Sequence, residues 1–132
     1  MASELRVNTL KDASGNNSIA TSVVASGSAK AWLNLNGTGT IAARDSYNIA
    51  STTDVGTGQY TPSFTTSFGN ANYVFQYTTV RISSGSYGLL PLIDVAITQA
   101  TGSCRAEIQG SVVATYYEDP SVYCMSYDGD LA

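Results

Sequence analysis

The sequence predicts an all-β fold, an antiparallel β-sandwich of jelly-roll-like form with an extended N-terminal arm. Three observations support this prediction. Only 12% of the residues are charged, and the Thr, Ser, Asn and Gly that supply polarity instead favour turns and the solvent faces of strands. Short alternating segments recur from residue 29 onward, separated by turns that contain Gly or Asn, a spacing typical of sandwiches and barrels. A length of 132 residues suits one domain with one modest core.

The first 28 residues differ in composition from the rest, because Ser, Ala and Gly dominate them and large apolar residues are few. We therefore expect residues 1–28 to form an extended arm rather than a helix, followed by a sandwich domain at residues 29–132. The apolar side chains of the arm are too few for a core of their own, so we expect them to pack on the main body or on a neighbouring subunit. A frayed terminus is the alternative. The assembly and docking candidates are Leu5, Val7, Leu10, Ile19, Val23 and Val24.

Within the sandwich domain, residues 31–35 alternate in polarity and Asn36-Gly37 is a strong hairpin signal. Pro62 removes a ladder donor, which predicts an edge strand or a bulge there. Bulky residues on both faces of residues 72–82 predict a strand that is covered on both sides. The tail that follows Pro120 shows no clear period. The expected strands span residues 31–35, 38–41, 46–53, 59–66, 72–82, 92–99, 103–109 and 111–117.

The charge balance disfavours several classes of partner. Ten acidic and six basic residues give a net charge of −4, and the basic residues are scattered, whereas nucleic-acid binding needs them gathered on one face. No apolar stretch reaches the ~18 residues of a membrane helix, and the N-terminus lacks a basic segment followed by an apolar one. We therefore expect a soluble chain without nucleic-acid binding, membrane insertion or a secretion signal.

The absence of histidine removes the commonest general base and every Ser-His or Cys-His pair. A carboxylate pair could still act on a glycosidic bond, but no spacing singles out two acids, so we expect no enzyme, no catalytic residues and no cofactor. The segment Asp128-Gly129-Asp130 resembles a fragment of a calcium loop without its later bidentate Glu. We expect solvated acids and no metal site, with a weak calcium site as the alternative. The carboxylate candidates are Asp45, Asp54, Asp94 and Glu107.

Nine tyrosines against three phenylalanines indicate a surface for partners or ligands, because tyrosine combines apolar area with a hydroxyl that tolerates water. Tyr116 and Tyr117 are adjacent, so one of them must face away from the core of a sandwich. An aromatic sugar site is one form of this hypothesis, and ordinary strand packing is the alternative. The candidate surface residues are Tyr116, Tyr117, Tyr123 and Tyr127.

Cys104 and Cys124 form the only cysteine pair. They are interpreted as two thiols packed like small hydrophobic side chains. A disulfide between them is the alternative, and a protein made in a reducing cytoplasm would close it only after release.

An ordered run of short motifs resembles virion structural proteins of tailed bacteriophages, especially those of marine bacteria and cyanobacteria, which are often called tail-fibre-like. The run begins at residues 31–49, and residues 1–10 are similar to the N-terminal strand that precedes the module in that family. The resemblance covers about residues 1–75. Its further motifs are Ser51, Thr53-Asp54, Gly56-Thr57-Gly58, Tyr60, Phe64-Thr65-Thr66 and Asn70-Ala71-Asn72-Tyr73.

The resemblance implies a β-rich, non-enzymatic component of the phage virion surface, commonly a homotrimer in fibres, that can serve host attachment. The chain lacks a long shaft, which favours a small fibre tip or adaptor over a complete tail fibre. A knob that decorates the capsid is one alternative, and a glycan-binding module is a second. The expected partners are the chain itself, other virion proteins of the tail or capsid, and a host surface glycan. The expected location is the phage particle, assembled in the host cytoplasm.

Overall fold

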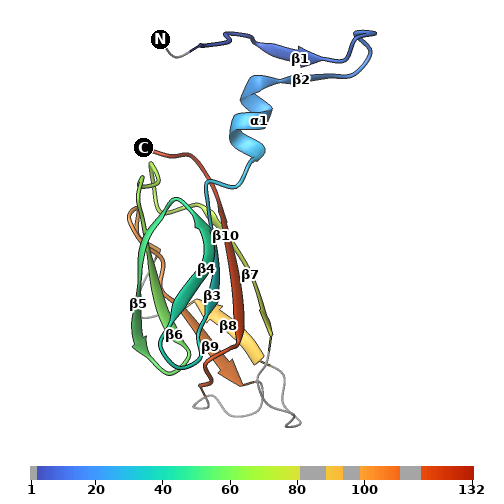
Figure 1. Cartoon of the computed structure of the whole chain (residues 1–132). Helices are drawn as coiled ribbons and strands as arrows, with labels where there is room; N and C mark the ends of the chain where they lie inside the picture. The colour runs from blue at the N-terminus through green and yellow to red at the C-terminus, as the bar shows by residue number, and fades with distance from the viewer. Residues whose placement is uncertain (1–2, 81–88, 94–98, 111–116) are drawn as a thin grey trace.

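The computed structural model describes residues 3–80, 89–93, 99–110 and 117–132, and this part of the chain is mostly β. Two short strands and one helix come first, and eight longer strands follow (Figure 1). The elements are β1 (Thr9–Lys11), β2 (Ser18–Ala20), α1 (Thr21–Gly27), β3 (Ala31–Asn36), β4 (Ala42–Tyr47), β5 (Ile49–Gly56), β6 (Gln59–Phe64), β7 (Val74–Val80), β8 (Leu89–Ile93), β9 (Ala106–Gly110) and β10 (Val122–Asp128).

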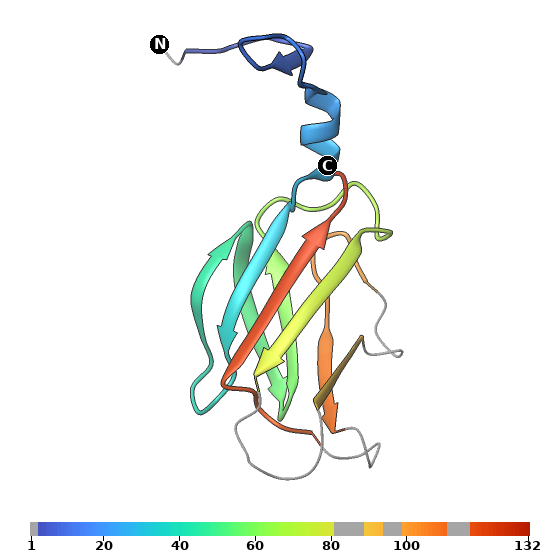
Figure 2. The ribbon, with the colours of Figure 1, turned by 90° about the vertical axis from the view of Figure 1, so that its right-hand side faces the viewer.

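The eight longer strands form two four-stranded antiparallel sheets. The first sheet has the order β4-β3-β10-β7 and the second has the order β5-β6-β9-β8. Figure 2 shows β3, β10 and β7 side by side in the first sheet. The chain changes sheet after β4, after β6, after β7 and after β9, so both sheets combine segments that lie far apart in sequence.

One core receives side chains from both sheets. The alternation predicted for residues 31–35 is confirmed, since the apolar side chains of β3 are buried and Trp32 lies on the other face. Aromatic rings fill the end of the core where Phe64 makes edge contacts with Phe68 and Tyr127, at centroid distances of 4.9 and 5.0 Å. Such edge-to-face geometry is the favoured arrangement of aromatic pairs. The remaining core residues include Leu33, Leu35, Tyr60, Tyr73, Ala106, Ile108, Tyr123 and Met125.

The predicted hairpin after Asn36-Gly37 is present, but its second strand is β4 and not residues 38–41. The strand predicted over residues 46–53 is confirmed only in part: residues 49–53 lie in β5, but residues 46 and 47 end β4, because the chain turns at Asn48 and passes from the first sheet to the second. Asn48 has a φ of 56°, a left-handed conformation that Asn tolerates better than most residues. The turn at Asn48 therefore divides the predicted strand between the end of β4 and the start of β5.

Two expectations about strand position are wrong. Pro62 lies in β6, which is an inner strand with no register shift at that residue. The pairing of β6 with β9 is confined to Gln59 and Tyr60, so the missing N–H of Pro62 falls beyond that ladder. Strand β7 is at the edge of its sheet and most of its side chains are exposed, so it is not covered on both sides.

The C-terminal half agrees with the predictions only in part. β8 overlaps the start of the strand predicted at residues 92–99, and β9 matches the end of the one predicted at residues 103–109. Residues 111–116 of the next predicted strand lie outside the described residues, and Tyr117 is at an isolated bridge. The tail contains β10, an inner strand of the first sheet that the sequence analysis missed.

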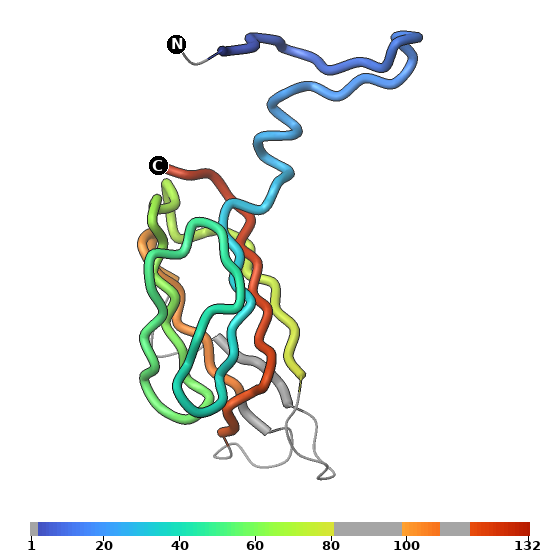
Figure 3. Tube along the Cα trace, in the orientation of Figure 1, coloured from blue at the N-terminus to red at the C-terminus, as the bar shows by residue number. Residues whose placement is uncertain are grey.

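The N-terminal segment, residues 3–28, is not uniformly extended. It contains the β1–β2 ribbon and α1, which corrects the expectation that no helix forms there. Figures 1 and 3 show this segment beyond the end of the sheets at which the C-terminus lies. No residue of α1 is buried, so the helix is held by local bonds and not by packing on the sheets.

Candidate functional site

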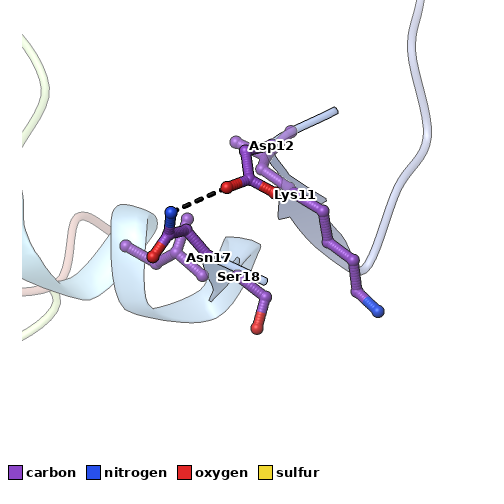
Figure 4. A pocket seen from close by; sticks show the side chains of 6 residues that line it. Lys11, Asp12, Asn17 and Ser18 are labelled. Atoms are coloured by element: carbon purple, nitrogen blue, oxygen red, sulfur yellow. Dashed lines mark hydrogen bonds between the residues drawn. The ribbon is translucent and has the colours of Figure 1, made fainter. Parts of the chain in front are cut away.

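The turn between β1 and β2 is fixed by the carboxylate of Asp12. It accepts hydrogen bonds from the Ser14 hydroxyl at 2.9 Å, from the Asn16 backbone N–H at 3.0 Å and from the Asn17 side-chain amide at 2.7 Å. Figure 4 shows Asp12 and Asn17 facing each other across this turn. The bond from Ser14, together with those from Asn17 and Asn16, lowers the pKa of Asp12 below its usual value. The ribbon therefore has a defined turn although all its residues are exposed.

Helix α1 is tied to its surroundings at both ends. At the start, Thr21 donates from its backbone N–H and its hydroxyl to the carbonyl of Asn8, and the hydroxyl also lies 3.1 Å from the carbonyl of Val7. At the end, the ammonium of Lys30 donates to the carbonyls of Ala25 and Ser28. A lysine on the last carbonyls of a helix is a common way to satisfy them. These bonds give the N-terminal segment a definite shape outside the sheets.

All six docking candidates of the N-terminal segment are exposed. Leu5 is 81% exposed, and the exposed fractions of the other five lie between 39% and 55%. Burial of one such side chain on a partner would contribute about 1–2 kcal/mol, since each of them is already partly covered. The structure therefore places the candidates where a partner could cover them, but not on the body of the same chain. The six are Leu5, Val7, Leu10, Ile19, Val23 and Val24.

The tyrosine surface predicted from the sequence is wrong for two of its four members. Tyr123 and Tyr127 are 0% exposed and point into the shared core from β10. Burial raises the pKa of both phenols above the ordinary value. Tyr117 is half-buried, and Tyr116 lies outside the described residues. Because Tyr60 and Tyr73 are also buried, much of the tyrosine excess serves packing.

The two cysteines are free and lie in different surroundings. Cys104 is buried in the core, where burial raises the pKa of its thiol to about 11. Cys124 is half-buried on β10, on the face opposite to Tyr123 and Met125. The interpretation of Cys104 as a small hydrophobic side chain fits this position, and the alternative of a bridge to Cys124 is not formed in the structure.

The outer face of the first sheet carries an aromatic pair that the sequence analysis did not select. Trp32 on β3 and Tyr47 on β4 are direct cross-strand partners, and Tyr47 is 55% exposed. The next pair on this face is Asn34 with Asp45, and the side-chain oxygen of Asn34 is buried without a hydrogen-bond partner. The outward position of Trp32 could be predicted from the sequence, because residues of β3 that alternate with the buried Leu33 must face outward.

A groove of about 320 Å³ lies between β4 and β5, where the chain passes from one sheet to the other. Ile41 and Ile49 form part of its lining and also pack against the core. The smaller residues of the lining include Ala42, Ala43 and Ala50. No motif predicted this groove, because it depends on two strands of different sheets lying at the same side of the molecule.

The acidic residues offer no convergent site in the described ranges. Glu107 is buried and pairs with Arg105 at 3.2 Å, so its carboxylate has a structural partner. Asp45 and Asp54 lie on different sheets, and Asp94 is outside the described residues. Among the residues with described placement, no group of three or more Cys, Asp or Glu side chains could hold a metal ion. No helix in the same ranges has the length and apolar character of a membrane span.

No protein-family model, curated protein or solved structure matches this chain.

Proposed function

We propose that the chain is a non-enzymatic structural protein of a bacteriophage virion, a tail-fibre-like surface appendage or adaptor that can serve host attachment. Its two sheets would form a jelly-roll-like β-sandwich. Its N-terminal segment would act as an arm that joins the chain to further copies of itself, as a homotrimer, and to other virion proteins. The phage context of this proposal depends on the resemblance of residues 1–75 to tail-fibre-like proteins.

The observation that supports docking is the contrast between the N-terminal segment and the rest of the chain. The sheets bury a core, although five of their large apolar side chains are exposed as well, whereas no residue of the segment 3–28 is buried and all six of its large apolar candidates are open to solvent. A segment that exposes all of its large apolar side chains has a surface suited to a partner. Low charge also favours close subunit contact, because few ions need to be desolvated.

The test compares the full chain with a variant that lacks residues 1–28. We expect the full chain to form an oligomer in light scattering and the truncated chain to be a folded monomer that no longer enters virions. A full chain that stays monomeric, with virion incorporation unchanged by the truncation, would overturn the proposal. Imaging of the labelled protein on intact particles distinguishes a position on the tail from a knob on the capsid.

A glycan-binding function is a second candidate, and the pair of Trp32 and Tyr47 on the outer sheet face favours it. Aromatic rings beside amide and carboxylate groups are suited to sugars, because the ring covers apolar C–H groups and the polar groups bond the hydroxyls. We expect binding on a glycan array to be lost in Trp32→Ala and Tyr47→Ala. The matched control is Val74→Ala, at a residue that is 57% exposed on β7. Absence of binding by the unaltered chain would remove this candidate.

A further inference from the structure

We propose that two copies of the chain pair antiparallel through the free edge of β7, across a two-fold axis at Tyr77. The sheets β4-β3-β10-β7 of the two copies would join there into one continuous sheet. This inference goes beyond the proposed function, because the contact needs no residue of the N-terminal segment. It joins a chain of one oligomer to a chain of another, since a two-fold contact cannot close a trimer.

Strand β7 has a free edge without the usual protection. It pairs only with β10 within the part of the chain that the structure describes, and Figure 2 shows it at the margin of its sheet. Its seven residues include no charged side chain, proline or glycine. Charged side chains, proline and bulges are the features by which natural sheets keep an edge from pairing. The edge of β7 is therefore open to another strand.

The other edges of the two four-stranded sheets each carry a protective feature. Strand β4 has Arg44 and Asp45 and a register shift against β3. Strand β5 has register shifts against β6 at two places, and β8 contains Pro91. Protection at these edges, and its absence at β7, indicates that β7 is the edge that meets a partner strand.

Strand β7 also exposes apolar surface. Val74, Tyr77 and Val80 are 57%, 43% and 52% exposed. Among the described residues of the two four-stranded sheets, only Tyr47 and Val55 are other large apolar residues that are exposed. Apolar surface concentrated on one strand indicates a contact surface, and pairing along β7 would cover part of it.

The sequence of β7 is complementary to itself when it is reversed about Tyr77. Aromatic pairs, and pairs of an aromatic ring with a β-branched residue, stabilise neighbouring strands, and no like charges meet in this arrangement. A second copy of the chain is therefore the partner that the strand itself specifies. The facing pairs are Val74 with Val80, Phe75 with Thr79, Gln76 with Thr78, and Tyr77 with Tyr77 of the other copy.

The pleat of the strands fixes the register. Facing residues of an antiparallel pair share a face of the sheet, and a two-fold axis perpendicular to the sheet keeps the outer faces of both copies on one side. The axis must therefore pass through a residue and not between two residues. An axis at Tyr77 pairs all seven residues of the strand, whereas an axis at Gln76 or Thr78 pairs only residues 74–78 or 76–80. Tyr77 is thus the centre that uses the whole strand.

The contact is weak in dilute solution. One strand on each side makes an interface smaller than the standard size of about 1,600 Å², and the net charge of −4 on each copy opposes approach. The carboxylate of β10, Asp128, faces Val74 in register and accepts a hydrogen bond from Gln76 at 3.3 Å. The pairing therefore forms when chains are held close together, as on an assembled particle, and dilute truncated chains stay monomeric.

Crosslinking between residues 76 and 78 tests the register. All variants carry Cys124→Ser, because Cys124 faces Thr78 within one chain and would react with a new thiol there. Full chains with Gln76→Cys are mixed with full chains with Thr78→Cys and oxidised mildly. In the proposed register residues 76 and 78 face each other with Cβ atoms about 5 Å apart, whereas the 76–76 and 78–78 pairs are diagonal, at about 7 Å.

We expect the rate constant for the mixed disulfide to exceed those for both homodisulfides by at least about fivefold, because a disulfide needs closely spaced Cβ atoms. Gln76 and Thr78 are both exposed, so the homodisulfides serve as controls for accessibility. Equal rate constants, or a faster homodisulfide, would overturn the inference.

A charge on the free edge provides a second test. At high concentration we expect the unaltered full chain to form a species of doubled mass in sedimentation velocity, and we expect Thr78→Lys to remove it. The matched control is Val55→Lys, at a residue that is 45% exposed on the edge strand β5, and it should keep that species. Circular dichroism checks that both variants fold. Retention of the species in Thr78→Lys, or its loss in Val55→Lys as well, would contradict pairing through β7.

Leu5→Asp separates this inference from the proposed function. It alters the N-terminal segment and leaves β7 unchanged, so it should abolish the oligomer of the proposed function and keep the preference for the mixed disulfide. An oligomer of the unaltered chain without that preference means that the inference fails and the proposed function stands. A preferred mixed disulfide in a chain whose self-association does not depend on Leu5 means that the inference stands and the docking role of the segment fails.

Discussion

The hydroxyl of Tyr60 donates a hydrogen bond of 2.7 Å to the carboxylate of Asp119, 59 residues further along the chain. The same carboxylate oxygen accepts the backbone N–H of Gly58 at 2.7 Å. Tyr60 is fully buried on β6, and Asp119 precedes β10 in the other sheet. The bond therefore connects the turn between β5 and β6 with the segment that leads into the central strand of the first sheet.

Loss of this carboxylate should destabilise the fold. We expect Asp119→Ala to lower the free energy of unfolding by about 2 kcal/mol, because the Gly58 N–H loses its acceptor and the buried Tyr60 hydroxyl keeps only the longer bond of 3.3 Å to the carbonyl of Gly37. Asp119→Asn keeps one acceptor oxygen and should cost less than half as much. Urea unfolding followed by circular dichroism measures both values. Equal stability of Asp119→Ala and the unaltered chain would contradict this role for the carboxylate.

The chain should lose stability at alkaline pH because of its buried phenols. Burial is the largest cause of the raised pKa of Tyr60, Tyr73, Tyr123 and Tyr127. An unfolded tyrosine has a pKa of about 10, so the unfolded chain releases these protons first. Stability is complete below about pH 10 and falls above it, by about 1.4 kcal/mol per pH unit for each buried tyrosine.

Thermal unfolding between pH 8 and pH 12, with tyrosinate absorbance recorded in parallel, measures this loss. Tyr127→Phe provides the control, because the Tyr127 hydroxyl donates only to the sulfur of Met125. Above pH 10 the free energy of unfolding of that variant should fall less steeply with pH than that of the unaltered chain. The difference in slope corresponds to about one titrating proton. Tyrosinate absorbance that rises fully before the fold is lost would show that the buried phenols ionise in the native state, against this prediction.

Asn48 should be hard to replace, because its conformation and its side chain both hold the passage between the sheets. Its side-chain amide donates to the carbonyls of Lys30 and Thr66 at 3.0 Å, and its side-chain oxygen accepts the N–H of Thr66 at 2.7 Å. We expect Asn48→Ala to cost about 3 kcal/mol, from lost hydrogen bonds and a left-handed backbone. Asn48→Gly loses the same hydrogen bonds but tolerates the left-handed backbone, so it should be about 1 kcal/mol more stable than Asn48→Ala in urea unfolding. Equal stability of the two variants would contradict a contribution from the φ of 56°.

The sequence predicted the β class and the inward face of β3, because both depend on composition and on a period of two over a few residues. It missed β10, because no period was assigned to the residues after Pro120, although Tyr123, Met125 and Tyr127 alternate and are buried. Tertiary pairing explains why β3 was predicted and β10 was not. β10 lies between β3 and β7, and its polar residues face outward. The helix at residues 21–27 was also missed, because Ser and Val have only modest helix propensity and the bonds that hold its ends come from Thr21 and Lys30.

The functional surfaces were predictable only where they depend on one segment. Exposed apolar residues in the N-terminal segment needed no tertiary information, because a segment so poor in large apolar side chains cannot enclose them. The groove between β4 and β5 and the pair of Trp32 with Tyr47 depend on which strands are neighbours, and that information comes from sheet order. Tyr123 and Tyr127 were assigned to the surface for the same reason, since nothing local shows that their strand is central.

The two thiols should differ sharply in reactivity. Only the thiolate reacts quickly with a disulfide reagent, and burial both raises the pKa of Cys104 to about 11 and blocks access to it. At pH 8 we expect one thiol per native chain to react with a coloured disulfide reagent, and two per chain to react in urea. Cys124→Ser should abolish the native reaction and leave one reactive thiol in urea, whereas Cys104→Ser should leave the native reaction unchanged. Fast reaction of both thiols in the native chain would show that the core around Cys104 opens to solvent, and absence of any free thiol in urea would show a bridge.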